Sequence, residues 1–179
     1  MKTTQIFLAG FGGQGILFAG KFLAGKGLTE GHEVSWLPSY GPEMRGGTAS
    51  CGVVISDQPI ATPIVLHPDV LVAMNLPSLD RYEKDVQPGG VIYADSSLIE
   101  RKVARDDVTV HYIPATMLAA QNGLDGLANM IIMGNILKNE GSINDESVEK
   151  ALAKCISARH ADMLKFNRDA LILGSEIND

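Results

Sequence analysis

A glycine-rich stretch near the start of the chain has residue types whose spacing could bind a phosphate. Residues 10–15 read GFGGQG and fit the pattern G-x-G-x-x-G. Glycines between a strand and a helix allow a sharp turn, and the start of the helix offers free backbone N–H groups to an anion. The pattern therefore predicts either a loop that binds a phosphate-bearing ligand or a bare, tight strand-to-helix turn.

A nicotinamide dinucleotide fits this motif poorly. A dinucleotide fold has an acidic residue at the end of its second strand, where it holds the ribose hydroxyls. Here the second expected strand ends in WLPS, and Glu30 and Glu33 come before that strand or at its start. Residues 15–21 also match G-x-x-x-x-G-K, but Phe22 stands where magnesium needs a Ser or Thr. A free NAD-dependent oxidoreductase and an ATPase are both disfavoured.

A second loop, residues 38–47, carries side chains that could contact a ligand or a protein. It reads PSYGPEMRGG and includes Tyr40, Glu43 and Arg45. Arg45 could hold a carboxylate or phosphate through two parallel hydrogen bonds. It could also pair with Glu43 and stiffen the loop, or belong to a rigid surface for a partner protein. Because loops that leave the carboxyl ends of parallel strands share one edge of the sheet, we expect this loop beside the glycine motif.

The rest of the chain carries no recognisable catalytic set. The four histidines lack metal-ligand spacing, no G-x-S-x-G elbow occurs, and no two carboxylates stand out as an acid–base pair. Cys51 and Cys155 are far apart in the sequence, whereas an iron–sulfur cluster needs about four thiolates. We interpret Cys155 as a buried, unreactive thiol on the apolar side of a helix, and His111 as a structural residue in a strand. The sequence predicts a binding scaffold without catalytic machinery.

Composition indicates one globular domain that spans residues 1–179. The chain is 45% hydrophobic and 20% charged, with a net charge of −6 and no Lys/Arg block. That balance excludes the electrostatic surface expected for nucleic acid or an anionic membrane. The start of the chain makes a poor signal peptide, and no stretch approaches the ~18 apolar residues that a membrane span needs. We therefore expect a cytoplasmic protein.

Hydrophobic periodicity predicts alternating strands and helices. The expected strands are 5–9, 32–39, 48–56, 69–74, 90–95 and 108–114, and the expected helices are 16–28, 76–86, 126–139, 145–157 and 161–173. This order predicts an α/β fold, a Rossmann-like three-layer sandwich with a mostly parallel sheet. Residues 48–60 have the pattern of a hairpin, so we also expect some antiparallel pairing. The helix at 126–139 is apolar nearly all round, which predicts burial in the domain or against a partner.

The two loops together resemble a known family. The segments GFGGQGILFAGKFLA and SYGPEMRGGTASCGVVIS are similar to the gamma subunit of the 2-oxoacid:ferredoxin (acceptor) oxidoreductases. The YGPEMRGG form resembles the enzymes for 2-oxoglutarate and branched-chain 2-oxoacids. The positions that match the motifs of the family are Gly10, Gly12, Gly13, Gln14, Gly15, Tyr40, Glu43, Arg45, Gly46 and Gly47. The resemblance gives none of them a chemical step and gives the chain no metal ligand.

The resemblance implies a subunit of a larger enzyme. Such an enzyme decarboxylates a 2-oxoacid on thiamine diphosphate and Mg, passes electrons through iron–sulfur clusters to ferredoxin, and forms an acyl-coenzyme A. This chain lacks the cluster cysteines and a thiamine diphosphate motif, so those cofactors would lie in alpha and beta subunits. A ferredoxin-like delta subunit stays open. The chain would dock on its partners and complete the active site. The alternative is a stand-alone nucleotide- or coenzyme A-binding module of the Rossmann type.

Overall fold

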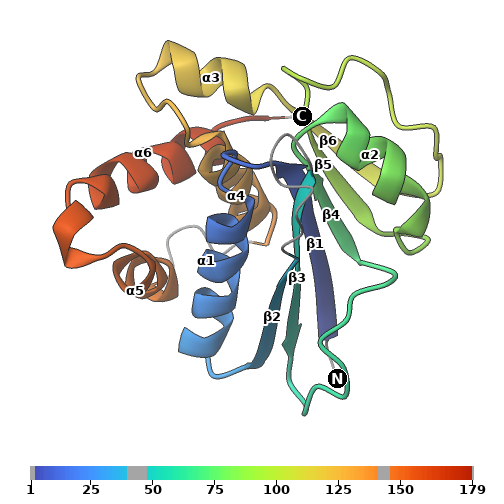
Figure 1. The fold of residues 1–179 in the computed structure, drawn as a ribbon, viewed down its shortest axis with the longest axis horizontal. Helices are drawn as coiled ribbons and strands as arrows, with labels where there is room; N and C mark the ends of the chain where they lie inside the picture. Colours follow the sequence, from blue (N-terminus) through green and yellow to red (C-terminus); the bar gives the residue numbers. More distant parts are fainter. Residues whose placement is uncertain (1–2, 40–47, 141–145, 179) are drawn as a thin grey trace.

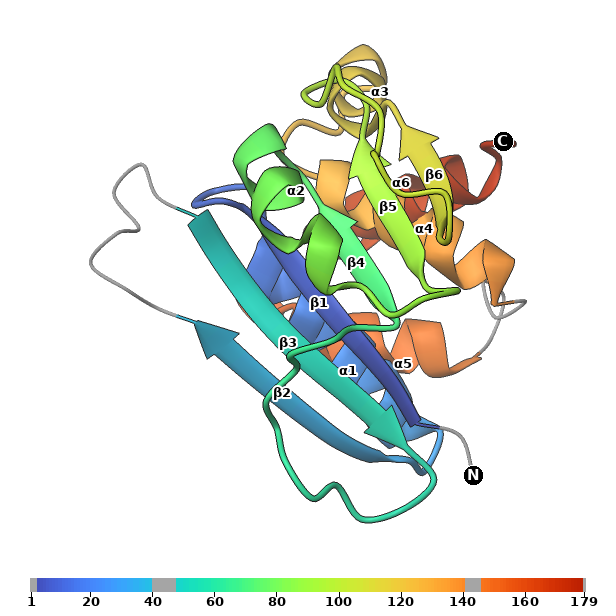
Figure 2. The same cartoon turned by 90° about the vertical axis from the view of Figure 1, so that its right-hand side faces the viewer.

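A six-stranded sheet forms the centre of the molecule. The structure, a computed structural model, describes residues 3–39, 48–140 and 146–178. The strands are β1 (Thr3–Phe11), β2 (Glu33–Ser39), β3 (Thr48–Ser56), β4 (Val70–Ala73), β5 (Val91–Asp95) and β6 (Thr109–Ile113). They lie in the order β2-β3-β1-β4-β5-β6, which Figure 2 shows face-on. Valine and isoleucine are frequent in these strands, as expected for side chains that fit a pleated, buried surface.

Five strands of the sheet run in one direction and β3 runs against them. β1 pairs in parallel with β4, β4 with β5, and β5 with β6, whereas β3 is antiparallel to both β1 and β2. The predicted mostly parallel sheet with some antiparallel pairing is confirmed. The predicted hairpin within 48–60 is wrong, because the described segment after Ser56 forms no strand and the hairpin partner of β3 is β2.

Among the described residues, six α-helices and two short 3₁₀ turns accompany the sheet. The helices are α1 (Ile16–Thr29), α2 (Leu76–Tyr82), α3 (Ala115–Gln121), α4 (Ala128–Asn139), α5 (Glu146–Cys155) and α6 (Met163–Ser175), and the 3₁₀ turns are η2 (Glu83–Asp85) and η3 (Ala158–His160). The short helix α3 was not expected from the sequence. Within the described ranges, no helix is long and apolar enough to cross a membrane.

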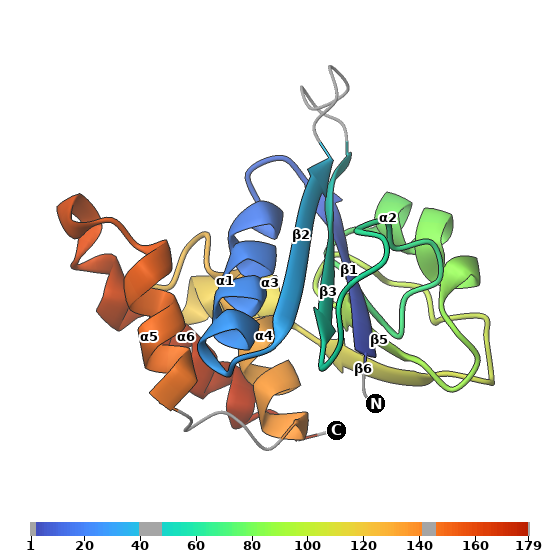
Figure 3. The same ribbon diagram turned by 90° about the horizontal axis from the view of Figure 1, so that it is seen from below.

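The helices are distributed unevenly over the two faces of the sheet. α1 and α4 lie on one face with α5 and α6 outside them, while α2 lies on the opposite face (Figures 1 and 3). α4 is therefore enclosed, with every residue from Ala128 to Leu137 buried. This confirms the burial predicted for the apolar helix. The residues that bury it belong to the same domain.

The crossing of α4 and α6 depends on two glycines. A Cβ on Gly134 would overlap the carbonyl of Leu171, and a Cβ on Gly174 would overlap the carbonyl of Ile131. The two backbones therefore approach more closely than any larger residue allows. This close approach packs α6 onto α4 and closes the main hydrophobic core.

Candidate functional site

The glycine motif joins β1 to α1 at the carboxyl edge of the sheet. Gly10 lies inside β1, which extends beyond the predicted 5–9, so the turn itself is residues 12–15. Gly13 and Gly15 have φ angles of 97° and 71°, a left-handed conformation that side chains beyond glycine adopt at a cost. The sharp strand-to-helix turn predicted from the sequence is therefore present.

The side chain of Gln14 bridges the two strands at this edge. Its Oε1 accepts a hydrogen bond of 2.6 Å from the Phe11 amide, and its Nε2 donates one of 2.9 Å to the Met74 carbonyl, just beyond β4. β1 continues into α1 on one face and β4 into α2 on the other, so this is the point where an open α/β sheet usually receives its ligand. The Phe11 amide and the Met74 carbonyl are thus hydrogen-bonded to Gln14 and are not available to a ligand in the crevice.

Asn129 braces the other end of the turn from the buried helix α4. Its Nδ2 donates a 3.0 Å hydrogen bond to the Gly15 carbonyl, and a Cβ on Gly15 would come within 2.5 Å of the same nitrogen. Asn129 is 2% exposed, and its Oδ1 has no hydrogen-bond partner in the structure. Sequence reasoning missed this residue. Nothing in the local sequence singles it out, because the same helix also carries Asn135 and Asn139.

A cavity of about 230 Å³ lies beside the motif. Its lining residues are Gly13, Gln14, Met74, Leu98, Thr116, Ala119, Ala120, Asp125, Gly126 and Ala128. Asp125 is the single charged residue among them, so no lysine or arginine of this lining could neutralise a phosphate. The described side chains fit the tight-turn interpretation of the motif better than a phosphate site.

A buried carboxylate near this cavity has a structural role. Asp95, at the end of β5, accepts hydrogen bonds from the Ser97 amide and from both the amide and the hydroxyl of Thr116. It ties the start of α3 to the sheet. Because its oxygens are occupied by these donors, Asp95 is poorly placed to act as a general base.

The flanks of the second loop lie at the same edge of the sheet as the glycine motif. Ser39, the last residue of β2, pairs with Ser50, which in turn pairs with Ala9 of β1. The shared edge predicted for the two loops is thus confirmed for the strand ends. The five predicted residues Tyr40, Glu43, Arg45, Gly46 and Gly47 lie outside the described residues.

Glu30 and Glu33 lie at the positions predicted from the sequence, away from the place where NAD would need an acidic residue. Glu30 follows α1, and Glu33 begins β2 opposite Ser56, at the far edge of the sheet from the glycine motif. Moreover, β3 separates β2 from β1. No described acidic side chain therefore stands at the carboxyl end of β2, where the ribose of a dinucleotide would need it.

Burial raises the pKa of both cysteine thiols. Cys51 is fully buried beneath α1, and burial raises its pKa to about 12, against the smaller lowering effect of a hydrogen bond with Trp36. Cys155 is half-buried rather than buried as predicted, and burial raises its pKa as well. His111 stacks on Tyr93 with ring centroids 4.7 Å apart, which fits its predicted structural role. In the part of the chain that the structure describes, no three His, Cys, Asp or Glu residues are grouped to hold a metal.

Comparison with known proteins places this scaffold in a family. The model of the family described as pyruvate ferredoxin/flavodoxin oxidoreductase matches residues 5–177. The chain belongs to this family. The resemblance that the two loops predicted is confirmed, since the match covers both loops and nearly all of the chain.

The relatives of this chain in the oxidoreductase family are of two lengths. The 2-oxoglutarate synthase subunit KorC of Methanocaldococcus jannaschii is 37% identical over 169 residues, which are 92% of this chain and 90% of KorC. The ketoisovalerate oxidoreductase subunit VorA of Methanothermobacter thermautotrophicus is 39% identical over 173 residues, which are 96% of this chain but only 36% of VorA. The chain thus spans about a third of the length of VorA.

Solved structures of the family have the same fold. The gamma subunit of a keto/oxoacid ferredoxin oxidoreductase from Geobacter sulfurreducens superposes with a TM-score of 0.82, at 28% identity, over 98% of this chain and 96% of that one. A 2-oxoglutarate:ferredoxin oxidoreductase from Magnetococcus marinus gives 0.85 over 97% of this chain and 30% of that one. Its identity of 23% supports the fold alone.

Proposed function

We propose that this chain is the gamma subunit of a multi-subunit 2-oxoacid:ferredoxin oxidoreductase that oxidatively decarboxylates 2-oxoglutarate to an acyl-coenzyme A. The observation that carries the proposal is the family match over residues 5–177 together with the similarity to KorC along 90% of KorC. The choice of 2-oxoglutarate over ketoisovalerate rests on KorC, because VorA shares only a third of its length with this chain.

The cofactors of the complex belong to its other subunits in this proposal. The chain has two cysteines, Cys51 and Cys155, which lie in separate elements, β3 and α5. They cannot supply the four thiolates of an iron–sulfur cluster. Thiamine diphosphate, Mg and the clusters are therefore assigned to alpha and beta subunits, with a ferredoxin-like delta subunit as a further candidate partner. Ferredoxin would receive electrons through those chains.

The glycine motif and the second loop are the proposed contact surface with the partners. Gly10, Gly12, Gly13, Gln14 and Gly15 form one part of it, and Tyr40, Glu43, Arg45, Gly46 and Gly47 form the other. The braces from Gln14 and Asn129 give the first part a fixed shape. The acidic lining of the neighbouring cavity favours protein contact over the phosphates of coenzyme A at this point.

Reconstitution tests the proposal. The chain is mixed with the alpha and beta subunits from the same organism, and reduction of ferredoxin is followed with coenzyme A and either 2-oxoglutarate or ketoisovalerate. We expect the chain alone to be inactive, the partners alone to be impaired, and the mixture to be active with 2-oxoglutarate. Full activity of the partners without this chain would refute the proposal.

A thermal-shift measurement examines the stand-alone alternative. A module that binds coenzyme A by itself would gain ~2.7 kcal/mol of stability at a hundred times its dissociation constant. We expect no shift of the melting temperature of the isolated chain with coenzyme A, ATP or NAD. A saturable shift would favour the stand-alone module over the subunit.

A further inference from the structure

Among the described residues, no helix covers one half of the sheet on the face opposite α1. α2 lies over the β4 side, whereas the described segment that crosses β2 and β3 on that face is the one that joins β3 to β4, residues 57–69 (Figures 2 and 3). We call this segment the strap. Parallel strands normally have both faces covered, whereas antiparallel strands such as β2 and β3 often have one face exposed. The face formed by β2, β3 and the strap is called the open face below.

The strap is fixed to the sheet at its centre and at one end. Val65 is 9% exposed and lies over Gly52, where an added Cβ would come within 3.1 Å of it. At the end of the strap, Asp69 Oδ2 accepts a 2.7 Å hydrogen bond from the Gln5 amide, and the Asp69 amide donates one of 2.8 Å to the Gln5 carbonyl. The open face therefore has a defined shape before any partner binds.

Large apolar side chains are exposed on this face. Leu66 is 69% exposed and Ile64 is 54% exposed, on either side of the buried Val65. Leu37 of the edge strand β2 is 45% exposed and pairs with Gly52, the residue beneath the strap. These three side chains surround one point of the sheet, so they form a patch rather than scattered exposed residues. Exposed apolar patches on a protein surface mark sites of association.

The open face is also nearly free of charge. The strap from residue 58 to 68 contains no Lys, Arg, Asp or Glu, although 20% of the whole chain is charged. Val34 of β2 and Cys51 of β3 lie against glycines of α1, on the other face of the sheet. Because successive side chains of a strand point to opposite faces, the residues next to Val34 and Cys51 point to the open face. The side chains that point to this face are then those of Glu33, Ser35, Leu37 and Ser39 of β2 and of Ser50, Val54 and Ser56 of β3, with Gly52 between them. Glu33, at the end of β2 away from Leu37, is the charged one among them, and the β3 residues are buried. Charged residues are depleted in the same way at the buried centre of protein interfaces.

The relatives indicate which polypeptide covers the open face. In VorA, about two thirds of the length lies outside the domain shared with this chain, whereas in KorC the domain makes up nearly the whole protein. A domain that is joined covalently to further polypeptide in one relative must find the equivalent polypeptide by binding in the other. Given the subunit role proposed above, we propose that the open face binds the subunit equivalent to the remainder of VorA, through a neutral, apolar surface of that subunit.

Substitutions on the exposed side chains test the interface. Leu66→Asp, alone and combined with Leu37→Asp, places carboxylates in the patch, and Leu28→Asp is the matched control. Leu28 is 61% exposed at the end of α1, on the opposite side of the sheet. Affinity for the equivalent subunit, co-expressed from the same organism, is measured beside the melting temperature of each isolated variant. We expect Leu66→Asp to weaken binding at least about tenfold and the double variant to weaken it further, with melting temperatures and the control unchanged.

The outcomes separate this inference from the function on which it rests. If the unaltered chain binds none of the subunits, the proposed function fails. If it binds and the Leu66 and Leu37 variants bind equally well, the function stands and the open face is not the interface. A wild-type chain that elutes alone as a dimer, and as a monomer after Leu66→Asp, would identify a second copy as the occupant and overturn the proposal.

Discussion

At the scale of single residues, two amides determine the shape of the glycine motif. Gln14 ties the turn to the end of β4, and Asn129 ties it to α4. Neither role follows from the local sequence, because the partners lie 60 and 114 residues away. The sequence predicts that residues 10–15 turn sharply, because glycines between a strand and a helix allow such a turn whether or not a ligand binds there. What fills the space around the turn depends on long-range packing that no periodicity encodes.

Gly13 and Gly15 are predicted to respond differently to the same substitution. Both have positive φ, which costs about 1–2 kcal/mol for other residues. Nothing lies within 4 Å of a Cβ on Gly13, whereas a Cβ on Gly15 would overlap Asn129. We expect Gly13→Ala to lower the free energy of unfolding by that backbone cost alone, and Gly15→Ala to lower it by at least about 1 kcal/mol more.

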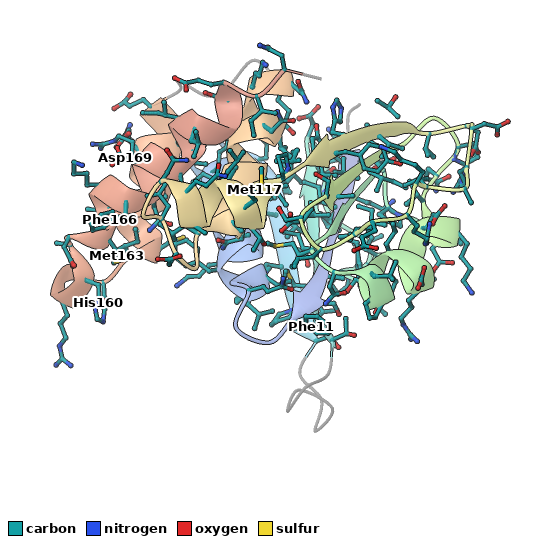
Figure 4. The ribbon with its side chains drawn as sticks, turned by 90° about the horizontal axis from the view of Figure 1, so that it is seen from above. Phe11, Met117, His160, Met163, Phe166 and Asp169 are labelled. Carbon is teal, nitrogen blue, oxygen red and sulfur yellow. The ribbon has the colours of Figure 1, made fainter. Side chains whose placement is uncertain are left out.

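A double-mutant cycle checks the physical reason for this difference. Asn129→Ala removes the overlapping side chain, so Gly15→Ala should cost about 1 kcal/mol less in that background than in the wild type. Chemical denaturation of the four proteins measures the coupling. Equal costs of Gly15→Ala in both backgrounds would mean that Asn129 does not limit the space at the turn. Figure 4 labels Phe11, the last residue of β1, on the strand that leads into this turn.

At the scale of elements, helix type and strand order were predictable to different degrees. The long apolar helix at 126–139 was predicted with its burial, because a helix that is apolar all round must be covered. α3 was missed because seven residues, ATMLAAQ, are too few to show a helical period. The insertion of β3 between β1 and β2 was also beyond the sequence, since strand order depends on which edges pair and not on the pattern within one strand.

The crossing of α4 and α6 gives a prediction at this scale. Gly134→Ala should lower the free energy of unfolding by about 1–3 kcal/mol, because the new methyl group overlaps the backbone of α6, which cannot rotate away as a side chain could. Thermal unfolding followed by circular dichroism measures the change. An alanine at position 134 that leaves the melting temperature unchanged would show that the two helices are less closely packed than described.

Gly25→Ala in α1 is the matched control. A Cβ on Gly25 would lie 3.7 Å from the Cβ of Ala151, an ordinary contact distance. Alanine favours the helix over glycine by about 0.8–1.0 kcal/mol, so this substitution should raise the melting temperature. The two substitutions have the same chemistry in helices of one core, and their opposite signs would isolate the effect of the close crossing.

At the scale of the whole molecule, the uneven distribution of helices separates two surfaces. The carboxyl edge carries the glycine motif and the flanks of the second loop, and the open face lies on the side of the sheet away from α1. Both surfaces meet near Leu37 and Ser39, at the carboxyl end of β2. This corner is the proposed contact region with a partner, whereas in the described interior the Cys51 thiol is buried and the Asp95 carboxylate is occupied by hydrogen bonds.

Arg45 provides the prediction for the assembled enzyme. The second loop contains one guanidinium, Arg45, and the sequence leaves three roles open for it: binding an anion, contacting a partner, or pairing with Glu43 to stiffen the loop. We expect Arg45→Ala to lower turnover or assembly of the reconstituted complex and to leave the melting temperature of the isolated chain unchanged. Arg159→Ala, at an exposed position of η3, is the control and should alter neither. If Arg45→Ala instead destabilised the isolated chain and left complex formation intact, Arg45 would serve the fold and the second loop would have no claim to be a contact surface.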